Sequence, residues 1–319
     1  MKKYNFLVLS GFIVIETIFL QPKFKTFNQA FSASKLEETL SSFKANKNLD
    51  IVGQFNEQII AEEMADRYLK KIPIPSLPTH LTLEQALQIQ DKFIQLLVPS
   101  YGKIVGYKAG LTNKEVQAKF KIDRPIAGVL LEKMLVKSGA IVSANFGTRP
   151  ILEGDLMVRV GSEKINTAKT TEEALAALDA VIPFLELPDL VYAENVKLTA
   201  PAIVAINVGA RLGIMGDPVP LTNLDEWQER LGKIKLIILD ESGAELAVGE
   251  SKALLGDPLK VVLWLRDDLQ ARGKSLKKGD LLSLGTITPG IPVKSGMKIR
   301  ARYLELDEDN SREIVVKFE

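Results

Sequence analysis

Arg149-Pro-Ile-Leu-Glu153-Gly-Asp155-Leu-Met-Val-Arg-Val160 is the stretch of this sequence that most strongly predicts a β-strand. Side chains two positions apart in a strand point to the same face, so a strand here places Glu153 and Asp155 together. The other face is apolar and consists of Leu152, Leu156, Val158 and Val160. We therefore predict a strand with one face in a core and two carboxylates fixed on the opposite face.

A third acid, Glu186, lies among apolar neighbours in Ile182-Pro-Phe-Leu-Glu-Leu-Pro188. Like charges held close together disfavour joint ionisation unless a cation offsets them. Three carboxylates such as Glu153, Asp155 and Glu186 suit an all-oxygen site for a hard cation. The alternative from spacing alone is a solvated strand face that carries a Glu-x-Asp pair.

The composition excludes several classes of chemistry. The 319 residues are 46% apolar and 25% charged, as expected for a globular protein, and the net charge of +1 gives no basic field for nucleic acid. There is no cysteine and one histidine, His80. This excludes thiolate nucleophiles, cysteine-based zinc sites, disulfides and paired histidine ligands. His80 lies in a proline-rich stretch, which argues against a Ser-His-Asp mechanism.

The first 33 residues have the layout of a secretory signal. Lys2 and Lys3 precede an apolar run at 6–15, and the small-residue segment Ala30-Phe-Ser-Ala33 precedes Ser34. We predict a signal peptide over residues 1–33 and export to a periplasmic, extracytoplasmic or lumenal location. An uncleaved anchor is the alternative, and it would be the protein's only association with a membrane.

Two further parts follow the predicted signal. Residues 34–79 are predicted to form a peripheral helical arm, with an apolar face at Ile59, Ile60, Met64 and Leu69, and then a proline-rich linker. Residues 80–319 are predicted to form the catalytic domain. It opens with Thr82-Leu-Glu-Gln85, which has the spacing of a helix capping box.

Within residues 80–319, few helices, many short strands and frequent glycine turns favour a mixed α/β fold built on a β-roll with peripheral helices. Neither a regular βαβ alternation nor a Gly-x-Gly-x-x-Gly or P-loop motif is present. Strands are expected at 101–112, 129–135, 140–142 and 151–160, a helix at 170–181 closed by Pro183, a hairpin at 233–248 and a helix at 257–273.

The turn Gly106-Tyr-Lys108-Ala-Gly110-Leu-Thr112 is a second candidate for chemistry. Glycines let a backbone approach a ligand closely, and Lys108 lies between two of them. The alternative is an ordinary turn with a surface lysine.

The order and spacing of several motifs resemble the hydratase and decarboxylase branch of the fumarylacetoacetate hydrolase superfamily. The resemblance covers about residues 80–305. The motifs are Gly106-Tyr-Lys-Ala-Gly-Leu-Thr112, Asp123-Arg-Pro125 with Gly128, Arg149-Pro-x-x-Glu-x-Asp155, Pro183-x-x-Glu186, Leu255-Gly-Asp-Pro-Leu259 with Trp264-Leu265, and Gly279-Asp280.

This resemblance implies a lyase similar to 2-keto-4-pentenoate hydratase, acting on a small 2-hydroxydienoate or 2-oxo acid with Mg²⁺ or Mn²⁺. The implied metal ligands are Glu153, Asp155 and Glu186, and the implied catalytic residue is Lys108. Contacts with the substrate are implied at Gly110, Leu111 and Asn207. No nucleic-acid partner is expected, and a homo-oligomer is left open.

Three positions depart from the family pattern. Hydratases of this branch usually carry an acid where this chain has Ile126, an aspartate where it has Ile206, and a threonine where it has Leu284. Without the acid at 126, the water that a hydratase adds has no evident base. A 2-oxo-3-hexenedioate decarboxylase therefore stays open as an alternative, as does a non-catalytic relative that binds a small acid or a metal.

Overall fold

The computed structural model describes residues 49–76, 80–306 and 312–319, with side chains from Glu57 onward. The predicted signal peptide lies outside these residues. The chain divides into two compact units, Met1–Gln54 and Phe55–Glu319. In the first unit only residues 49–54, the start of helix α3, are described. The predicted division at residue 80 stays a prediction.

The described helices and strands alternate irregularly along the chain. The α-helices are α3 (Leu49–Lys70), α4 (Leu83–Tyr101), α5 (Lys114–Phe120), α6 (Thr171–Ala176), α7 (Ala200–Ala205), α8 (Leu224–Arg230) and α9 (Pro258–Ala271), with a short 3₁₀ helix η4 (Asn207–Gly209). The strands are β1 (Ile104–Gly110), β2 (Ile126–Leu131), β3 (Leu135–Lys137), β4 (Ala140–Val142), β5 (Ile151–Val160), β6 (Leu178–Leu187), β7 (Leu212–Met215), β8 (Val219–Pro220), β9 (Lys235–Leu239), β10 (Glu245–Glu250), β11 (Leu281–Ser283), β12 (Ile291–Pro292), β13 (Lys298–Leu304) and β14 (Arg312–Phe318).

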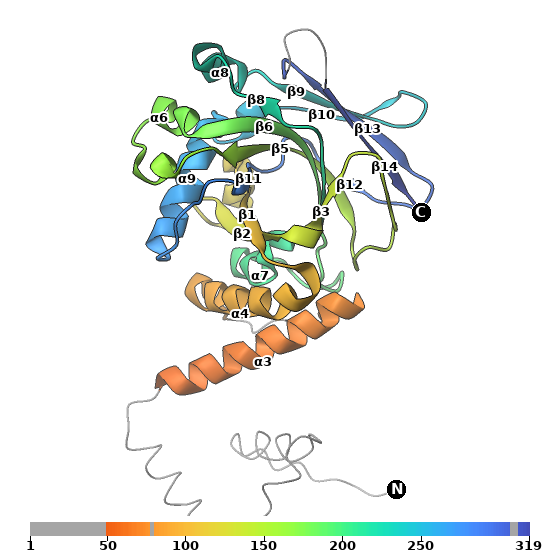
Figure 1. Cartoon of the computed structure of the whole chain (residues 1–319). Helices are drawn as coiled ribbons and strands as arrows, with labels where there is room; N and C mark the ends of the chain where they lie inside the picture. The colour runs from red at the N-terminus through yellow and green to blue at the C-terminus, as the bar shows by residue number, and fades with distance from the viewer. Residues whose placement is uncertain (1–48, 77–79, 307–311) are drawn as a thin grey trace, which may run out of the picture. The chain divides into compact units, whose positions relative to one another are not determined.

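Two sheets organise the larger unit. The nine-stranded sheet has the order β2-β1-β11-β5-β6-β7-β3, with β12 beside β5 and β8 beside β6. Figure 1 shows this sheet curling round on itself, with α4, α7 and α9 outside the curl. The second sheet has the order β10-β9-β13-β14-β4. The predicted mixed α/β roll with peripheral helices is confirmed.

Strand β5 occupies the residues predicted for it and is buried on both faces. Its even-numbered side chains, Leu152, Leu156, Val158 and Val160, are fully buried in the main core, as predicted. On the opposite face, Met157 packs in a smaller apolar cluster with Ile182 and Phe184 of β6. The carboxylates therefore lie on a face that is also covered by protein.

The helix predicted through Val181 is wrong beyond Ala176, because β6 begins at Leu178. The alanine-rich segment 174–177 ends with α6, whereas the β-branched Val181 and Ile182 favour a strand, which pairs with β5 along nearly its whole length. Pro183 does not close a helix. It lies where the outer partner of β6 changes from β8 to β7, so its missing N–H removes no bond from that ladder.

Other predicted elements are confirmed. The capping box at Thr82 and Gln85 is present at the start of α4, and β4, the β9–β10 hairpin and α9 lie where they were expected.

The predicted face of the arm is wrong in part, because Ile59 and Leu69 are 48% and 42% exposed. Among the α3 residues whose side chains the structure describes, those that are buried are Glu57, Ala61, Met64, Ala65 and Tyr68.

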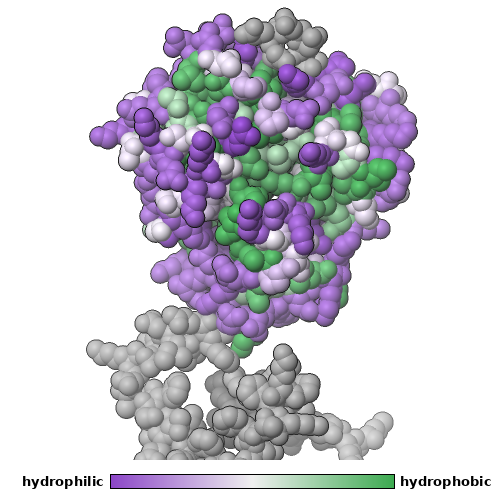
Figure 2. All heavy atoms as spheres, viewed as in Figure 1, coloured by the Kyte–Doolittle hydropathy of each residue, from purple (hydrophilic) through white to green (hydrophobic). Residues whose placement is uncertain are grey.

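The described helices include none that is long and apolar enough to cross a membrane. Figure 2 shows apolar residues gathered near the middle of the face viewed, with hydrophilic residues around them. On the five-stranded sheet, Ile141 and Val315 are exposed. The homo-oligomer left open by the sequence stays untested.

Candidate active site

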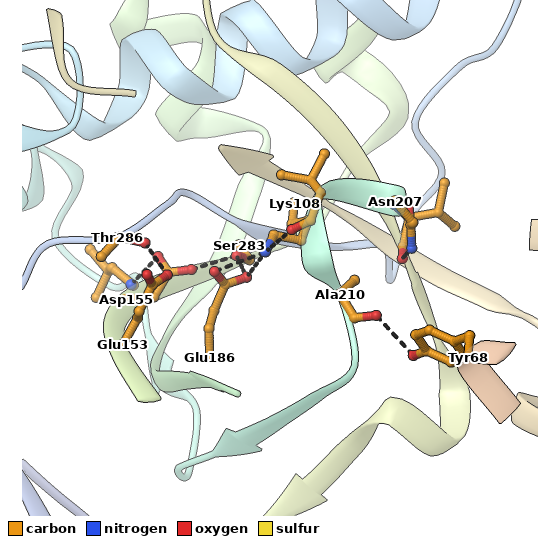
Figure 3. Close-up of polar contacts among 12 residues, drawn as sticks. Tyr68, Lys108, Glu153, Asp155, Glu186, Asn207, Ala210, Ser283 and Thr286 are labelled. Carbon is orange, nitrogen blue, oxygen red and sulfur yellow. Dashed lines mark hydrogen bonds and ion pairs between the residues drawn. The ribbon is translucent and has the colours of Figure 1, made fainter. Parts of the chain in front are cut away.

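The pairing of β5 with β6 sets the positions of the three acids. Glu153 lies directly opposite Glu186, and Asp155 lies two residues further along the same face of β5. Asp155 and Glu186 are 0% and 4% exposed, whereas Glu153 is half-buried. Figure 3 shows all three acids pointing toward one region. The predicted shared face is therefore confirmed.

Lys108 of β1 reaches this region from the opposite side. Its Nζ lies 2.9 Å from Glu186 Oε1 and 3.0 Å from Glu186 Oε2, and it donates to the Val208 carbonyl at 3.0 Å. With an exposed fraction of 3%, Lys108 is not the surface lysine of the alternative interpretation. A buried ammonium needs a partner of this kind, because desolvation of an unpaired charge costs several kcal/mol.

Ser283 lies at the centre of the site and was missed in the sequence. Its strand, β11, runs between β1 and β5, where Ser283 pairs with Lys108 on one side and Met157 on the other. The Ser283 hydroxyl contacts Asp155 Oδ2 through a short hydrogen bond and lies 3.0 Å from Glu186 Oε1. The sequence drew attention to the missing hydroxyl at Leu284, but the hydroxyl of this region lies one position earlier.

Two threonines after β11 complete the polar surroundings and were also missed. The chain continues alongside β5, so Thr286 Oγ1 donates to Glu153 Oε2 at 2.6 Å. Thr288 Oγ1 accepts from the backbone N–H of Gly154 at 3.0 Å. Their spacing of two residues on an extended segment was the only signal in the sequence.

The site makes two of its acids harder to ionise. Burial raises the pKa of the Asp155 carboxyl well above its ordinary value, and repulsion from Glu186 raises it further, although hydrogen bonds from Ser283 and the Leu156 N–H act in the opposite direction. Burial and Glu186 also raise the pKa of Glu153, against the effects of Thr286 and Lys108. A cation placed among these acids would favour their ionised forms.

The role of Glu153, Asp155 and Glu186 as metal ligands stays a prediction. Among the residues described, no group of three or more His, Cys, Asp or Glu side chains is placed to hold a metal ion. The contacts give a physical reason: the Lys108 ammonium takes both oxygens of Glu186. The donors are nevertheless all oxygens of the type that Mg²⁺ and Mn²⁺ prefer.

Strained backbone surrounds the Lys108 amine. Leu111 and Val208 have φ angles of 54°, in the left-handed region that a β-branched residue such as Val208 rarely adopts. A Cβ on Gly110 would lie 2.5 Å from Val208 Cγ1, so glycine is required for this close approach. Strain of this kind is often found at functional sites. The predicted substrate contacts at Gly110 and Leu111 stay predictions.

Asn207 has a clear structural function. It is fully buried, its Oδ1 accepts from the Val129 N–H at 2.7 Å, and its Nδ2 donates to the Val129 carbonyl at 2.8 Å. Gln90 of α4 similarly donates to the Ala127 carbonyl. Both side chains therefore satisfy backbone groups of β2, the strand at one end of the sheet. The Asn207 amide still has a second N–H and a second lone pair, and the predicted substrate contact stays untested.

Ile126 is buried at the start of β2, paired with Gly110. A cavity of about 570 Å³ lies beside it, but that cavity is lined by residues of α4, α7, α9 and the segment 121–127, and not by Lys108 or the three acids. His80 is exposed before α4. Neither feature adds a base to the site.

The curled mixed sheet, which brings three acids and a buried lysine together, has the fold of the fumarylacetoacetate hydrolase superfamily. The chain is 30% identical over 215 residues to 2-keto-4-pentenoate hydratase 1 of Dechloromonas aromatica (strain RCB), covering 67% of this chain and 79% of that protein. This protein therefore belongs to the hydratase and decarboxylase branch of that superfamily.

Other comparisons agree with this assignment. The chain is 29% identical over 233 residues to 4-oxalocrotonate decarboxylase of Pseudomonas putida, covering 73% of this chain and 86% of that protein. The structure of 4-oxalocrotonate decarboxylase from Pseudomonas putida G7, complexed with magnesium and adipate, matches with a TM-score of 0.74 at 26% identity, covering 86% of this chain and all of that one. No family model matches the chain.

Proposed function

We propose that this protein is a divalent-cation-dependent lyase, a hydratase that acts on a small 2-hydroxydienoate or 2-oxo acid of the 2-keto-4-pentenoate type. The observation that carries the proposal is the buried Lys108 ammonium, held against Glu186 beside Asp155 and Glu153. The relatives with hydratase and decarboxylase names support the reaction class.

Glu153, Asp155 and Glu186 would hold the cation, for which we propose Mg²⁺ or Mn²⁺. Bound there, the cation would supply Lewis-acid polarisation of the 2-oxo group. The donor chemistry fits, and Lys108 is the group that must yield, because it now occupies both oxygens of Glu186. The magnesium in the related decarboxylase structure supports this choice of ion.

Lys108 is the group we propose to move the proton between substrate atoms. Its Nζ has two kinds of partner, the Glu186 carboxylate and the neutral Val208 carbonyl. A cation bound to Glu186 would leave Lys108 with the Val208 carbonyl as its partner. In that position the Lys108 amine would be placed to move a proton to or from a bound substrate, as a general acid or base does.

Decarboxylation is the second candidate reaction. The observation that favours it is Ile126, an aliphatic and buried residue where the hydratases of the family usually carry an acid. A hydratase needs a base for the attacking water, whereas loss of CO₂ from a 2-oxo acid does not.

Turnover tests the proposal directly. The purified protein is incubated with Mg²⁺ and either a 2-hydroxydienoate or 2-oxo-3-hexenedioate, with loss of the ultraviolet chromophore and release of CO₂ both measured. Hydratase activity removes the first chromophore without CO₂, and decarboxylase activity releases CO₂ from the second. If neither substrate is converted in the presence of Mg²⁺, and the result is the same in EDTA, the protein is instead a non-catalytic relative.

We also propose that residues 1–33 direct export and are removed. Support comes from the basic start, the apolar run and the small residues that end at Ala33. Intact-mass measurement of the protein secreted from an expression host tests this. A mature chain that starts at Ser34 is expected, and a full-length membrane-bound chain would show the anchor instead.

A further inference from the structure

Ser283 is the one side chain that contacts two of the three proposed cation ligands among the residues that the structure describes. Its Oγ meets Asp155 Oδ2 through a short hydrogen bond and Glu186 Oε1 at 3.0 Å. Figure 3 shows the Ser283 hydroxyl between these two carboxylates, with Lys108 on the far side of Glu186. The residue is fully buried, so water does not compete for these contacts.

A hydroxyl carries one hydrogen, so Ser283 can donate to only one carboxylate at a time. Glu186 Oε1 already receives the Lys108 ammonium at 2.9 Å, whereas Asp155 Oδ2 has no contact with that ammonium. We therefore expect the Ser283 hydroxyl to donate its hydrogen to Asp155, the carboxylate that lacks the ammonium. It engages Oδ2 of Asp155, whose Oδ1 accepts from the Leu156 N–H, so both oxygens of that carboxylate are held in place.

The backbone around Ser283 allows little movement. Its strand is hydrogen-bonded on both sides, to β1 and β5. A Cβ at Gly106 would lie 2.0 Å from the Leu281 carbonyl oxygen, so β1 and β11 are in very close contact. Gly285, with φ of 107°, then turns the chain toward Thr286. Because this strand is rigid, Ser283 can fix the positions of the carboxylates instead of moving with them.

We infer that Ser283 is a positioning residue, whose hydroxyl fixes the orientation of the Asp155 and Glu186 carboxylates for binding a divalent cation. This inference rests on the proposed function, because it assigns Ser283 a part in cation binding. Hydrogen bonds to ligating carboxylates fix which oxygen faces the ion, and their loss typically lowers metal affinity about 10- to 100-fold. Ser283 itself is not a ligand in this arrangement.

The test is the affinity for Mn²⁺, measured by the electron paramagnetic resonance signal of the free ion. Ser283→Ala is expected to raise the Mn²⁺ dissociation constant about 10- to 100-fold. Ser251→Ala is the matched control, because Ser251 is also fully buried and donates to a carbonyl, that of Leu231, outside the site. It is expected to lower the unfolding temperature in EDTA about as much as Ser283→Ala, with Mn²⁺ affinity unchanged.

A second pair of variants covers the case in which Ser283→Ala does not fold. Ser283→Thr and Ser283→Val have nearly the same shape and differ in the hydroxyl, so the threonine variant should bind Mn²⁺ at least about tenfold more tightly. Equal affinities in this pair, or wild-type affinity in Ser283→Ala, would overturn the inference. Absence of Mn²⁺ binding by the wild-type protein would overturn the proposed cation dependence itself, which is a distinguishable result.

Discussion

Two buried cationic side chains, Lys108 and Arg211, differ in their partners, and the difference distinguishes a proposed catalytic role from a structural one. Arg211 NH1 donates to the Tyr68 carbonyl at 2.7 Å, and its guanidinium lies 4.0 Å from the centre of the Tyr68 ring. Tyr68 in turn donates to the Ala210 carbonyl at 2.9 Å. Both partners of Arg211 are neutral. Lys108 instead faces a carboxylate that a competing cation can draw away.

The two side chains differ in whether their partner can bind another cation instead. The contacts of Arg211 join the C-terminal part of α3 to the start of β7 and have no reason to change during a reaction. The contact of Lys108 with Glu186 has a charge on each side, in a region with two further acids. A fixed cation stabilises the fold, whereas a cation with an exchangeable partner suits proton transfer. Four predictions test this distinction.

The largest effect is expected for Lys108→Met. We expect kcat to fall about 10³-fold, because general acid and base groups typically contribute 10²- to 10⁴-fold. Mn²⁺ affinity should be retained or increased, since Glu186 loses its competing ammonium. The metal-free protein should unfold at a lower temperature than wild type, and Mg²⁺ should restore much of the loss. Kinetics and thermal unfolding with and without Mg²⁺ measure this.

Lys103→Met, at an exposed lysine just before β1, is the matched control and should change neither property. Near-normal turnover in Lys108→Met would remove the catalytic role of Lys108.

The converse result is expected for Arg211→Met. Loss of a buried hydrogen bond and a cation–π contact should lower the free energy of unfolding by about 2–4 kcal/mol. We expect kcat to stay within about twofold of wild type under conditions where the protein is folded. Urea denaturation and steady-state kinetics measure this. Arg159→Met removes a half-exposed pair with Asp179 and should cost under about 1 kcal/mol. A tenfold drop in kcat for Arg211→Met would contradict a purely structural role for Arg211.

A smaller effect is expected for Asp155→Asn in the absence of metal. Because the pKa of Asp155 is raised in the folded state, that state binds more protons than the unfolded one above the ordinary aspartate pKa. Its stabilising contribution is present at low pH and is lost as pH rises through the raised pKa. Asp155→Asn should therefore be more stable than wild type at pH 7, with no advantage near pH 3.

Urea titrations in EDTA across this pH range check the prediction for Asp155→Asn. The same variant should lose Mn²⁺ binding. A constant difference in stability from pH 3 to pH 7 would show that burial of the charge is not the cause.

The smallest effect is expected for His80→Ala. His80 is exposed in the segment before α4, so kcat should be unchanged and the free energy of unfolding should shift by less than about 0.5 kcal/mol. A kinetic assay and a melting curve are sufficient. Loss of turnover in this variant would favour a mechanism of the histidine-dependent hydrolase kind.

The sequence predicted what depends on local pattern. The alternation in β5 placed Glu153 and Asp155 on one face, and the isolated charge of Glu186 marked the third acid. The part played by β6 was not predictable in the same way. The helical pattern of the segment before it runs into its first residues, and the long pairing with β5 fixes where the strand begins.

Ser283 and Asn207 could not be assigned from pattern because their functions depend on distant partners. Ser283 meets Asp155 and Glu186, 128 and 97 residues away. Asn207 satisfies Val129, 78 residues away. The resemblance to the family drew attention to substitutions at Leu284 and Ile206, each one residue from a side chain that matters. Tertiary contacts at such separations leave no periodic trace in the sequence.

Tyr303 of β13 ties the formation of the site to the end of the chain. Its hydroxyl is fully buried between β5 and β6, where it contacts the Asp155 and Phe184 carbonyls and accepts from the Phe184 N–H at 3.0 Å. Ser283 and β14, which pairs with β13, also come late in the sequence. During synthesis, the acids of β5 and β6 thus leave the ribosome long before the groups that arrange them. A nascent chain that has reached β6 therefore contains the three acids but lacks Ser283 and Tyr303, which contact them and their strands.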